Sequence, residues 1–426
     1  MEKSKPRFKK HGRRYDIVVF GATGYSGSLT AEHIATNLPS DLKWAVAGRS
    51  VEKLSRVVAR CKELAPDCSG PEIEVCQLNH KEITALAKRT FCFIAIVGPY
   101  SLYGEHAFKA CAENGTHYLD CTPEVPWTLS MIQKYEASAK ASGACMFPQC
   151  AMEFAPSDLL TWAVAAEARS KFSSPIGDVV LELHQLRSIP SGGTVHTLLN
   201  LFDQYSLKTL NQSVKPYALS PIPNSILAPK KTFWSSLTGL THVPGLGTLT
   251  TSVTGKANEA IVFRTWGLMQ QEPGLKNEFY GSKFTYREYM YAHGVILGMM
   301  THYSVLTCFL LILLPPFRSL LKKLFKQGEG PNTEKAKNEV IELRAVANPD
   351  AEANFNKNRQ VFGKLSYHGS MYYLTAALLA QGARTLLEDD SARLTGESTH
   401  LPVSGKSIST AFRRLGSKFD TEIQNL

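Results

Sequence analysis

The sequence predicts an α/β protein with a Rossmann-type, doubly wound parallel sheet and a second α+β domain that carries a mixed sheet. An apolar run at residues 15–20 leads directly into a glycine-rich turn at 21–27 and then into a helix-like stretch. Strand-like and helix-like segments alternate as far as residue 150. The chain has 426 residues and is 44% apolar, which is enough for two domains that each have a core.

Three glycines in the first turn indicate a dinucleotide phosphate site. Gly21 permits the tight turn out of the strand, Gly24 lets backbone N–H groups approach a pyrophosphate, and Gly27 allows close helix–strand packing. The residues between them that we expect in the same site are Thr23, Tyr25 and Ser26. The spacing is GxxGxxG, and a three-glycine match is weak evidence until its neighbours are considered, because such turns are common.

The end of the second strand favours NADP(H) over NAD(H). Residues 42–47 form an apolar strand that ends in Gly48, Arg49 and Ser50. An NAD site places a carboxylate here for the ribose hydroxyls, whereas a guanidinium and a hydroxyl suit a 2′-phosphate. Arg49 and Ser50 are therefore predicted cofactor residues, the alternative being that Arg49 only caps a loop.

Further strands complete the first domain. They are predicted at residues 72–76, 90–97, 117–120 and 144–148, with helices at 81–88 and 104–114. Doubly wound sheets bind ligands at the carboxyl ends of their strands. One crevice should therefore be surrounded by residues 21–27, 48–50, 98–100 and 120–124. Gly98 and Pro99 join the predicted cofactor residues, together with Tyr100.

Hydride transfer also needs a proton carrier in an enclosed site. The predicted catalytic residues are Tyr100, then Glu124, with Asp120 beside them. The alternative is that Tyr100 packs in a turn and Asp120 caps a helix.

After residue 150 the pattern changes. Residues 156–170 are predicted as a helix, 176–186 as a half-exposed strand, and 248–254 and 260–266 as short strands. A composition rich in Pro, Gly, Ser and Thr fits a substrate or dimerisation domain. The predicted divisions are a flexible basic tail (1–14), the Rossmann domain (15–155), the second domain (156–365) and a C-terminal segment (366–426).

Charge and cysteine content limit the classes of partner. The net charge is +10, but much of the excess precedes the first strand, so a solvated tail is favoured over a nucleic-acid-binding surface. The nine cysteines include no CxxC pair and no Cys/His cluster at metal spacing, which indicates neither a metal site nor a disulfide framework. No secretory signal peptide is evident, and a reducing, cytosolic environment is expected.

An uncharged stretch between Glu288 and Arg318 predicts a lipid contact. Residues 295–314 are long enough, at about 1.5 Å per residue, to cross a hydrocarbon core of about 30 Å. Basic residues follow at 318–326, as is typical next to anionic headgroups. Polar residues inside the stretch weaken the case for a span. The segment 289–326 is therefore predicted to associate with a membrane or lipid-droplet surface, the alternatives being a span, a buried helix or the apolar face of a homodimer.

Several segments resemble saccharopine dehydrogenase-like oxidoreductases, a group that includes the trans-acting enoyl reductases. The shared segments are VVFGATGYSG (18–27), WAVAGRS (44–50), VGPYSLYGE (97–105), ACAENGTHYLD (110–120), SGGT (191–194) and YGSKFTYREY (280–289). The resemblance implies an NADP-type Rossmann domain, a mixed α+β middle domain and a C-terminal return to the Rossmann side, here at 367–387 and 406–416.

The resemblance also implies a cellular setting. Animal relatives are associated with membranes and lipid droplets, and a chain that returns to its first domain is expected to lay the apolar stretch within one leaflet. The expected location is the cytosolic face of a lipid droplet, the endoplasmic reticulum or a mitochondrion.

Two departures from the family pattern bear on catalysis. Pro123 stands near a position where relatives commonly have glycine, and Glu153-Phe154 replaces Asp-Ser before the Pro-Ser-Asp at 156–158. Three functions remain open: an NADP-dependent reductase of an apolar or lipid-linked substrate, a non-catalytic membrane or lipid-droplet protein that keeps a nucleotide-binding scaffold, and a saccharopine reductase of lysine metabolism.

Overall fold

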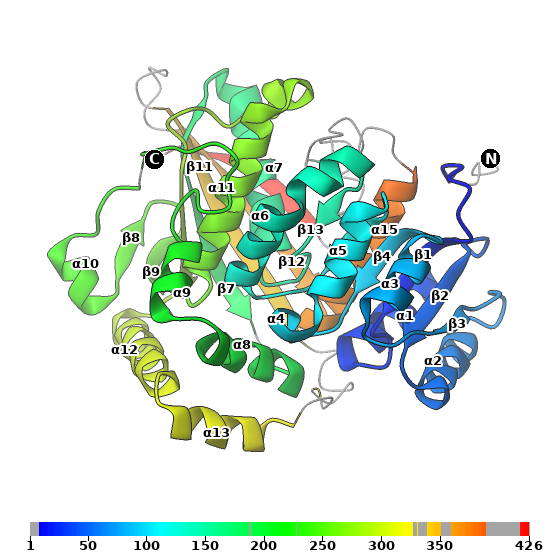
Figure 1. Cartoon of the computed structure of the whole chain (residues 1–426). Helices are drawn as coiled ribbons and strands as arrows, with labels where there is room; N and C mark the ends of the chain where they lie inside the picture. Colours follow the sequence, from blue (N-terminus) through cyan, green and yellow to red (C-terminus); the bar gives the residue numbers. More distant parts are fainter. Residues whose placement is uncertain are drawn as a thin grey trace.

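The computed structural model contains two sheets that lie side by side (Figure 1). It describes residues 8–186, 188, 190–226, 228–326, 330, 339–350, 359–388 and 418–425. The strand order is β3-β2-β1-β4-β5-β6 in the first sheet and β13-β12-β11-β7-β10-β9-β8 in the second. This arrangement confirms the predicted fold class.

The first sheet is parallel throughout. Its strands are β1 (Tyr15–Phe20), β2 (Trp44–Gly48), β3 (Glu72–Val75), β4 (Thr90–Ala95), β5 (His117–Asp120) and β6 (Met146–Phe147). The central strands β1 and β4 are buried along their whole length because helices cover both faces. The chain order changes direction between β1 and β4, which leaves a crevice at their carboxyl ends.

Alternate residues of β1 face two separate cores. Ile17 and Val19 point into one cluster, and Val18 and Phe20 into the other, as the two-residue repeat of a strand requires. The covering helices are α1 (Tyr25–Asn37), α2 (Val51–Leu64), α3 (His80–Ala87), α4 (Tyr100–Tyr103), α5 (Glu105–Glu113) and α6 (Val125–Ser142).

The second sheet is mixed. Its strands are β7 (Ile176–Leu186), β8 (Thr241–Val243), β9 (Gly247–Thr251), β10 (Thr285–Tyr291), β11 (Val340–Pro349), β12 (Arg359–His368) and β13 (Lys418–Asn425). Strands β7 and β10 run parallel, and the other pairs are antiparallel. Helix α7 (Ala155–Phe172) packs on this sheet together with α11 (Gly255–Gln271). Further elements of this domain include α8 (Gly192–Gln204), α9 (Leu207–Ser213), α10 (Phe233–Thr238) and the 3-10 helix η1 (Pro273–Glu278).

The short strand predicted at 260–266 is wrong, since these residues lie within α11. Ile261, Val262 and Phe263 have high β-propensity, which suggested a strand. Helix α11 is buried on most of its circumference, so its apolar residues show no clear 3.6-residue repeat in the sequence.

Helix α15 (Met371–Glu388) brings the chain back to the first domain. Its first half lies in the core of the second domain, and its second half lies in the core between the first sheet and α1. The Thr375 hydroxyl accepts a hydrogen bond from the backbone N–H of Met152 (3.1 Å). Not all of the predicted segment 366–426 returns, however, because β13 pairs with β12 in the second sheet. The predicted segment 406–416 lies outside the described residues.

The predicted flexible tail at 1–14 needs correction in its second half. The Arg13 guanidinium donates to the carbonyl oxygens of Ala87, Thr90, Asn114 and Gly115 and to the Thr116 hydroxyl, at 2.7–3.0 Å. This side chain therefore links the segments that lie at the amino-terminal ends of the parallel strands. Residues 1–7 lie outside the described part of the chain.

Helices α12 (Val295–Ile312) and α13 (Pro315–Leu324) occupy one end of the second domain (Figure 1). Within the described residues, α12 is the one helix long and apolar enough to cross a membrane, and only 11% of it is buried. It follows β10 directly, and α13 is tied to α8 by ion pairs from Arg318 and Lys322 to Asp203. Both ends of α12 are therefore fixed to the same folded body.

Candidate cofactor cleft

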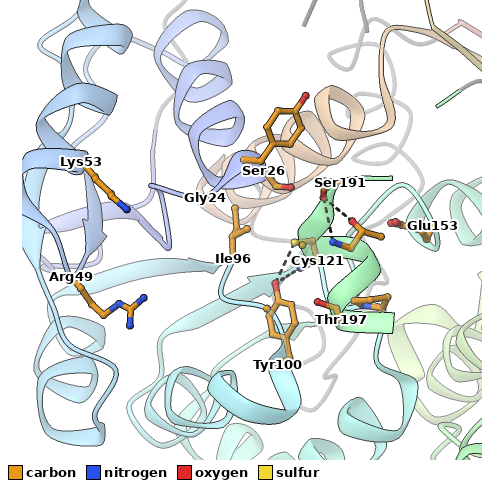
Figure 2. Close-up of a pocket in the computed structure, with 15 residues that line it drawn as sticks. Gly24, Ser26, Arg49, Lys53, Ile96, Tyr100, Cys121, Glu153, Ser191 and Thr197 are labelled. Carbon is orange, nitrogen blue, oxygen red and sulfur yellow. Dashed lines mark hydrogen bonds between the residues drawn. The ribbon is translucent and has the colours of Figure 1, made fainter. Parts of the chain in front are cut away.

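A cleft opens at the carboxyl ends of the first sheet (Figure 2). Its main part has a volume of about 490 Å³, and an adjoining hollow of about 270 Å³ shares Gly24, Arg49, Ile96 and Gly98 with it. The predicted residues that line one or both hollows are Gly21, Thr23, Gly24, Tyr25, Ser26, Arg49, Gly98 and Tyr100. Three predicted residues do not line them: Gly27 packs beneath the turn, Ser50 caps α2 and Pro99 precedes α4.

The turn after β1 requires glycine at two places. Gly21 has φ +87°, and a Cβ there would lie 2.2 Å from the Ile96 carbonyl oxygen. A Cβ on Gly27 would lie 2.2 Å from the Gly21 carbonyl oxygen, so α1 could not approach the turn as closely. Helix α1 begins beside the cleft with no side-chain cap and no acidic residue in its first turn. Its free N–H groups and positive dipole end therefore suit an anion such as a pyrophosphate.

Two cations stand at one end of the cleft (Figure 2). Arg49 follows β2, and Lys53 lies on the first turn of α2. The Ser50 hydroxyl caps this helix by accepting the backbone N–H of Lys53 (3.3 Å). Within the described part of the chain, neither cation forms an ion pair; the neighbouring acid, Glu52, pairs with Arg56 instead. Both charges are thus available to a phosphate, and Lys53 is a residue that the sequence reasoning missed.

Helix α8 forms the opposite wall of the cleft. Ser191, Gly193, Thr194 and Thr197 line it, and the Ser191 hydroxyl caps the helix by accepting the N–H of Thr194 (3.3 Å). Three of them, Ser191, Gly193 and Thr194, come from the SGGT segment, which carried part of the family resemblance but was not predicted as part of the site.

Tyr372 of α15 links the two walls. Its hydroxyl accepts the N–H of Ser191 and lies 3.0 Å from the Thr194 hydroxyl, while its ring meets the Tyr25 ring edge-on at 5.1 Å. Only the return of α15 to the first domain places this residue here.

Tyr100 lines the cleft, but its hydroxyl is already engaged. The phenol donates to the Ala95 carbonyl oxygen (2.9 Å), accepts the N–H of Cys121 (3.3 Å) and lies 3.2 Å from the Cys121 sulfur. Burial raises the pKa of this phenol well above its usual range. Tyr100 therefore joins the ends of β4 and β5, and its catalytic role stays a prediction.

Asp120 and Glu124 are buried and do not line the cleft. Asp120 accepts the N–H groups of Thr122 and Gln149 (2.9 and 2.8 Å) and the Tyr118 hydroxyl (2.8 Å), which fastens β5 to the segment after β6. Burial raises the pKa of Asp120 to about 7 despite these hydrogen bonds.

Glu124 holds the start of α4. Its carboxylate accepts the backbone N–H groups of Tyr100 (2.5 Å) and Ser101 (3.0 Å). Burial raises the pKa of Glu124, although these hydrogen bonds favour the charged form. The geometry gives Asp120 and Glu124 positioning roles, and direct participation in catalysis stays a prediction for both.

Glu153 is the carboxylate that does line the cleft, on the side of α8 (Figure 2). Burial raises the pKa of this side chain, which favours its protonated form. The sequence singled out Glu153 as a departure from the family pattern, but not as a predicted site residue.

Fold and cleft together define a dinucleotide-binding Rossmann protein. Residues 17–146 match the saccharopine dehydrogenase NADP binding domain. This part of the chain belongs to that domain family, and both the predicted resemblance and the predicted cofactor, NADP(H), are confirmed.

Curated relatives carry two kinds of name. A trans-acting enoyl reductase of Mycobacterium leprae is 35% identical over 208 residues, which are 49% of this chain and 47% of the relative. A lipid droplet localized protein of Caenorhabditis elegans is 35% identical over 149 residues, 34% of this chain and 35% of the relative. The matched regions span about half or less of these relatives' length.

A solved structure shares the whole fold. Saccharopine dehydrogenase (L-Glu forming) from Saccharomyces cerevisiae aligns with a TM-score of 0.51 and 10% identity, over 96% of this chain and 99% of that one. At this identity the likeness shows the fold alone.

Proposed function

We propose that this protein is an NADP(H)-dependent oxidoreductase that acts on an apolar or lipid-linked substrate at a membrane or lipid-droplet surface. The observation that carries the proposal is a single cleft with a helix N-terminus in the middle, two cations at one end that form no ion pair within the described residues, and the half-buried carboxyl of Glu153 at the other end. The names of the enoyl reductase and lipid-droplet relatives support the same reading.

Each part of the cleft has a distinct task in this proposal. The turn at 21–27 binds the pyrophosphate, and Arg49 with Lys53 binds the 2′-phosphate. When bound, the nicotinamide supplies or accepts a hydride. Glu153 places a carboxyl beside α8 that can give or take a proton, and α8 limits access of water from that side.

Binding can be tested by blocking the cleft. Thr197→Trp places an indole against Gly98, since a Cβ on Gly98 would already lie 3.1 Å from the Thr197 hydroxyl. Leu198→Trp is the matched control, because Leu198 is the next residue of α8 and points to solvent with 43% exposure. We expect NADPH fluorescence enhancement with the native chain and the control, and its loss with Thr197→Trp. Equal binding by both variants would place the cofactor elsewhere.

Turnover needs a second experiment. NADPH oxidation is followed with enoyl and carbonyl compounds on acyl chains of increasing length, using the native chain and Glu153→Gln. The proposal expects oxidation that depends on the acyl compound and falls in the variant while NADPH binding persists.

A non-catalytic nucleotide-binding protein is the second candidate. It is favoured by the engaged hydroxyl of Tyr100 and by the position of Asp120 and Glu124 outside the cleft lining. NADPH binding without turnover of any acyl compound would support it. A saccharopine reductase is the third candidate, and turnover of saccharopine with no response to apolar compounds would support that function.

The lipid contact is proposed to lie flat on the surface. Helix α12 is fixed at both ends to one body, so it can enter one leaflet but not cross the bilayer. Cys308 is the exposed member of the nine free cysteines and lies on α12. Lipid vesicles should therefore slow maleimide labelling of Cys308, while a thiol introduced by Lys88→Cys in the first domain should react at an unchanged rate. Unchanged labelling of both thiols would refute the lipid contact.

A further inference from the structure

A second cavity, of about 510 Å³, lies in the other domain and shares no lining residue with the cofactor cleft. Strands β9 and β10, the start of α11 and the segment before α10 surround it. Its lining includes four cations: Lys230, Lys231, Lys256 and Arg287. Nothing in the proposed hydride transfer uses this cavity.

Two of these cations lack a carboxylate partner. Within the described part of the chain, Lys230 and Lys231 form no ion pair, whereas Lys256 contacts Glu259 (2.6 Å) and Arg287 contacts Asp178 (3.2 Å). The ammonium of Lys231 lies 5.4 Å from the centre of the Tyr289 ring. Burial, together with the nearby Lys256, lowers the pKa of Lys231. Within the described residues, the lining thus carries four cations against two carboxylates, Glu259 and Glu288.

The remaining carboxylate of the lining, Glu288, is not available as a counterion. It accepts hydrogen bonds from the hydroxyls of Ser157, Ser252, Thr254 and Tyr286 and from the Asn258 amide, at 2.6–3.2 Å. These five uncharged donors use both of its oxygens and hold the carboxylate in place. Within the described residues, Glu288 therefore fixes part of the cavity wall without forming an ion pair with the lysines.

The start of α11 adds to the positive potential. Gly255 and Lys256 form the first turn of this 17-residue helix and line the cavity. No side chain caps this end, and no acidic residue stands in the first turn. The free N–H groups and the helix dipole favour an anion at the same place as the lysines.

The cavity adjoins the exposed apolar face of α12. Thr251, part of its lining, hydrogen-bonds His302 of α12 (2.8 Å), and the Tyr303 hydroxyl of α12 donates to the Leu237 carbonyl oxygen of α10 (2.9 Å). Helix α10 begins two residues after Lys231 and exposes Phe233 and Trp234 by 72% and 70%.

Helix α12 extends this apolar surface. Its large exposed side chains include Ile296, Met300, Phe309 and Leu310. We use the name apolar platform for six exposed side chains, which are Phe233 and Trp234 of α10 and Ile296, Met300, Phe309 and Leu310 of α12. A cationic cavity therefore opens beside a surface suited to hydrocarbon, which is the arrangement that an amphiphilic anion matches.

We propose that this cavity binds the phosphate headgroup of an anionic phospholipid whose acyl chains lie against the apolar platform. The inference rests on the proposed lipid contact of α12 and extends it from a general surface to a specific headgroup. The phosphate replaces the missing counterion of Lys230 and Lys231 and meets the N–H groups at the start of α11.

Vesicle flotation tests the proposal with the full chain. Native protein should float more strongly with vesicles of phosphatidylcholine and phosphatidic acid than with phosphatidylcholine alone. Lys231→Ala should weaken binding to the anionic vesicles by about fivefold, and the Lys230→Ala/Lys231→Ala variant by about 25-fold. Lys88→Ala removes an exposed lysine from the first domain and should leave flotation unchanged.

A neutral substitution separates the cavity from general surface charge. Ala228→Trp fills the cavity without changing its charge, so it should abolish the preference for phosphatidic acid and leave binding to phosphatidylcholine intact. An undiminished preference in this variant would overturn the headgroup site.

The remaining outcomes are also decisive. Native protein that floats with neither kind of vesicle refutes the lipid contact itself, whereas native flotation equal to that of the lysine variants refutes only the headgroup site. Glycerol 3-phosphate that bound the free protein as tightly as the vesicles do would identify a soluble ligand and overturn the proposal.

Discussion

Replacing Arg49 should separate the affinities for NADPH and NADH. Arg49 directly follows β2, lines both hollows of the cleft and forms no ion pair within the described residues. NADPH carries a 2′-phosphate that NADH lacks, so a phosphate contact would contribute to one cofactor alone. Arg49→Ala should therefore weaken binding of NADPH and leave binding of NADH near its native value.

The size of the effect follows from the exposure of the side chain. A charge-assisted hydrogen bond contributes about 1.5–3 kcal/mol when it is well shielded from water. Arg49 is exposed, so we take the lower end of this range, which corresponds to about a tenfold rise in the NADPH dissociation constant. Lys53 faces the same end of the cleft, and the Arg49→Ala/Lys53→Ala variant should lose more than either single variant.

Isothermal titration with both cofactors measures the difference directly. Arg56→Ala is the matched control, because Arg56 lies on the same helix as Lys53 but is exposed and pairs with Glu52. It should bind both cofactors like the native chain. Equal weakening of NADPH and NADH in Arg49→Ala would show that Arg49 supports the fold of the cleft rather than the 2′-phosphate. No weakening in the double variant would exclude this end of the cleft as the phosphate site.

Three further predictions concern stability. Gly27→Ala should lower the free energy of unfolding by about 1–3 kcal/mol, because its Cβ would meet a backbone oxygen at 2.2 Å, whereas Gly274→Ala, with open space around its Cβ, should change little in urea denaturation. Arg13→Ala should cost about 2–3 kcal/mol because it leaves several carbonyl groups without their donor, and the exposed Arg14→Ala should have no measurable effect on the melting temperature. Burial raises the pKa of Asp158 to about 7, so its folded form keeps a proton that the unfolded chain has released. Its contribution to stability should fall as the pH rises from about 4 to about 7, by up to about 1.4 kcal/mol per pH unit, and urea titrations of Asp158→Asn should lack this part of the slope.

Local sequence patterns were enough to predict the glycine turn and Arg49 of the cofactor cleft. Gly21 is required by its positive φ and Gly27 by a contact within the same turn, and Arg49 follows its strand directly, so neighbouring residues already carry this information. The central parallel strands β1 and β4 could also be predicted locally, since burial on both faces makes each of them a short, largely apolar run.

Long-range packing decided the rest. Thr197 and Tyr372 reach the cofactor cleft or its wall only because α8 and α15 pack against the first domain. Arg13 was predicted as part of a tail because its acceptors are mostly backbone carbonyl oxygens more than seventy residues away, and backbone carbonyls leave no pattern in a sequence. Helix α11 was mistaken for a strand since burial on nearly all sides removed its periodicity.

The uncharged stretch between Glu288 and Arg318 shows what sequence composition determines and what tertiary contacts add. Its composition alone determined that α12 would be apolar and long enough to span a bilayer. Only the tertiary structure decided that both ends are attached to one body and that a cationic cavity lies beside it. Hydrophobicity is a property of each residue and can be read along the chain, whereas the orientation of a helix depends on contacts between residues far apart in sequence.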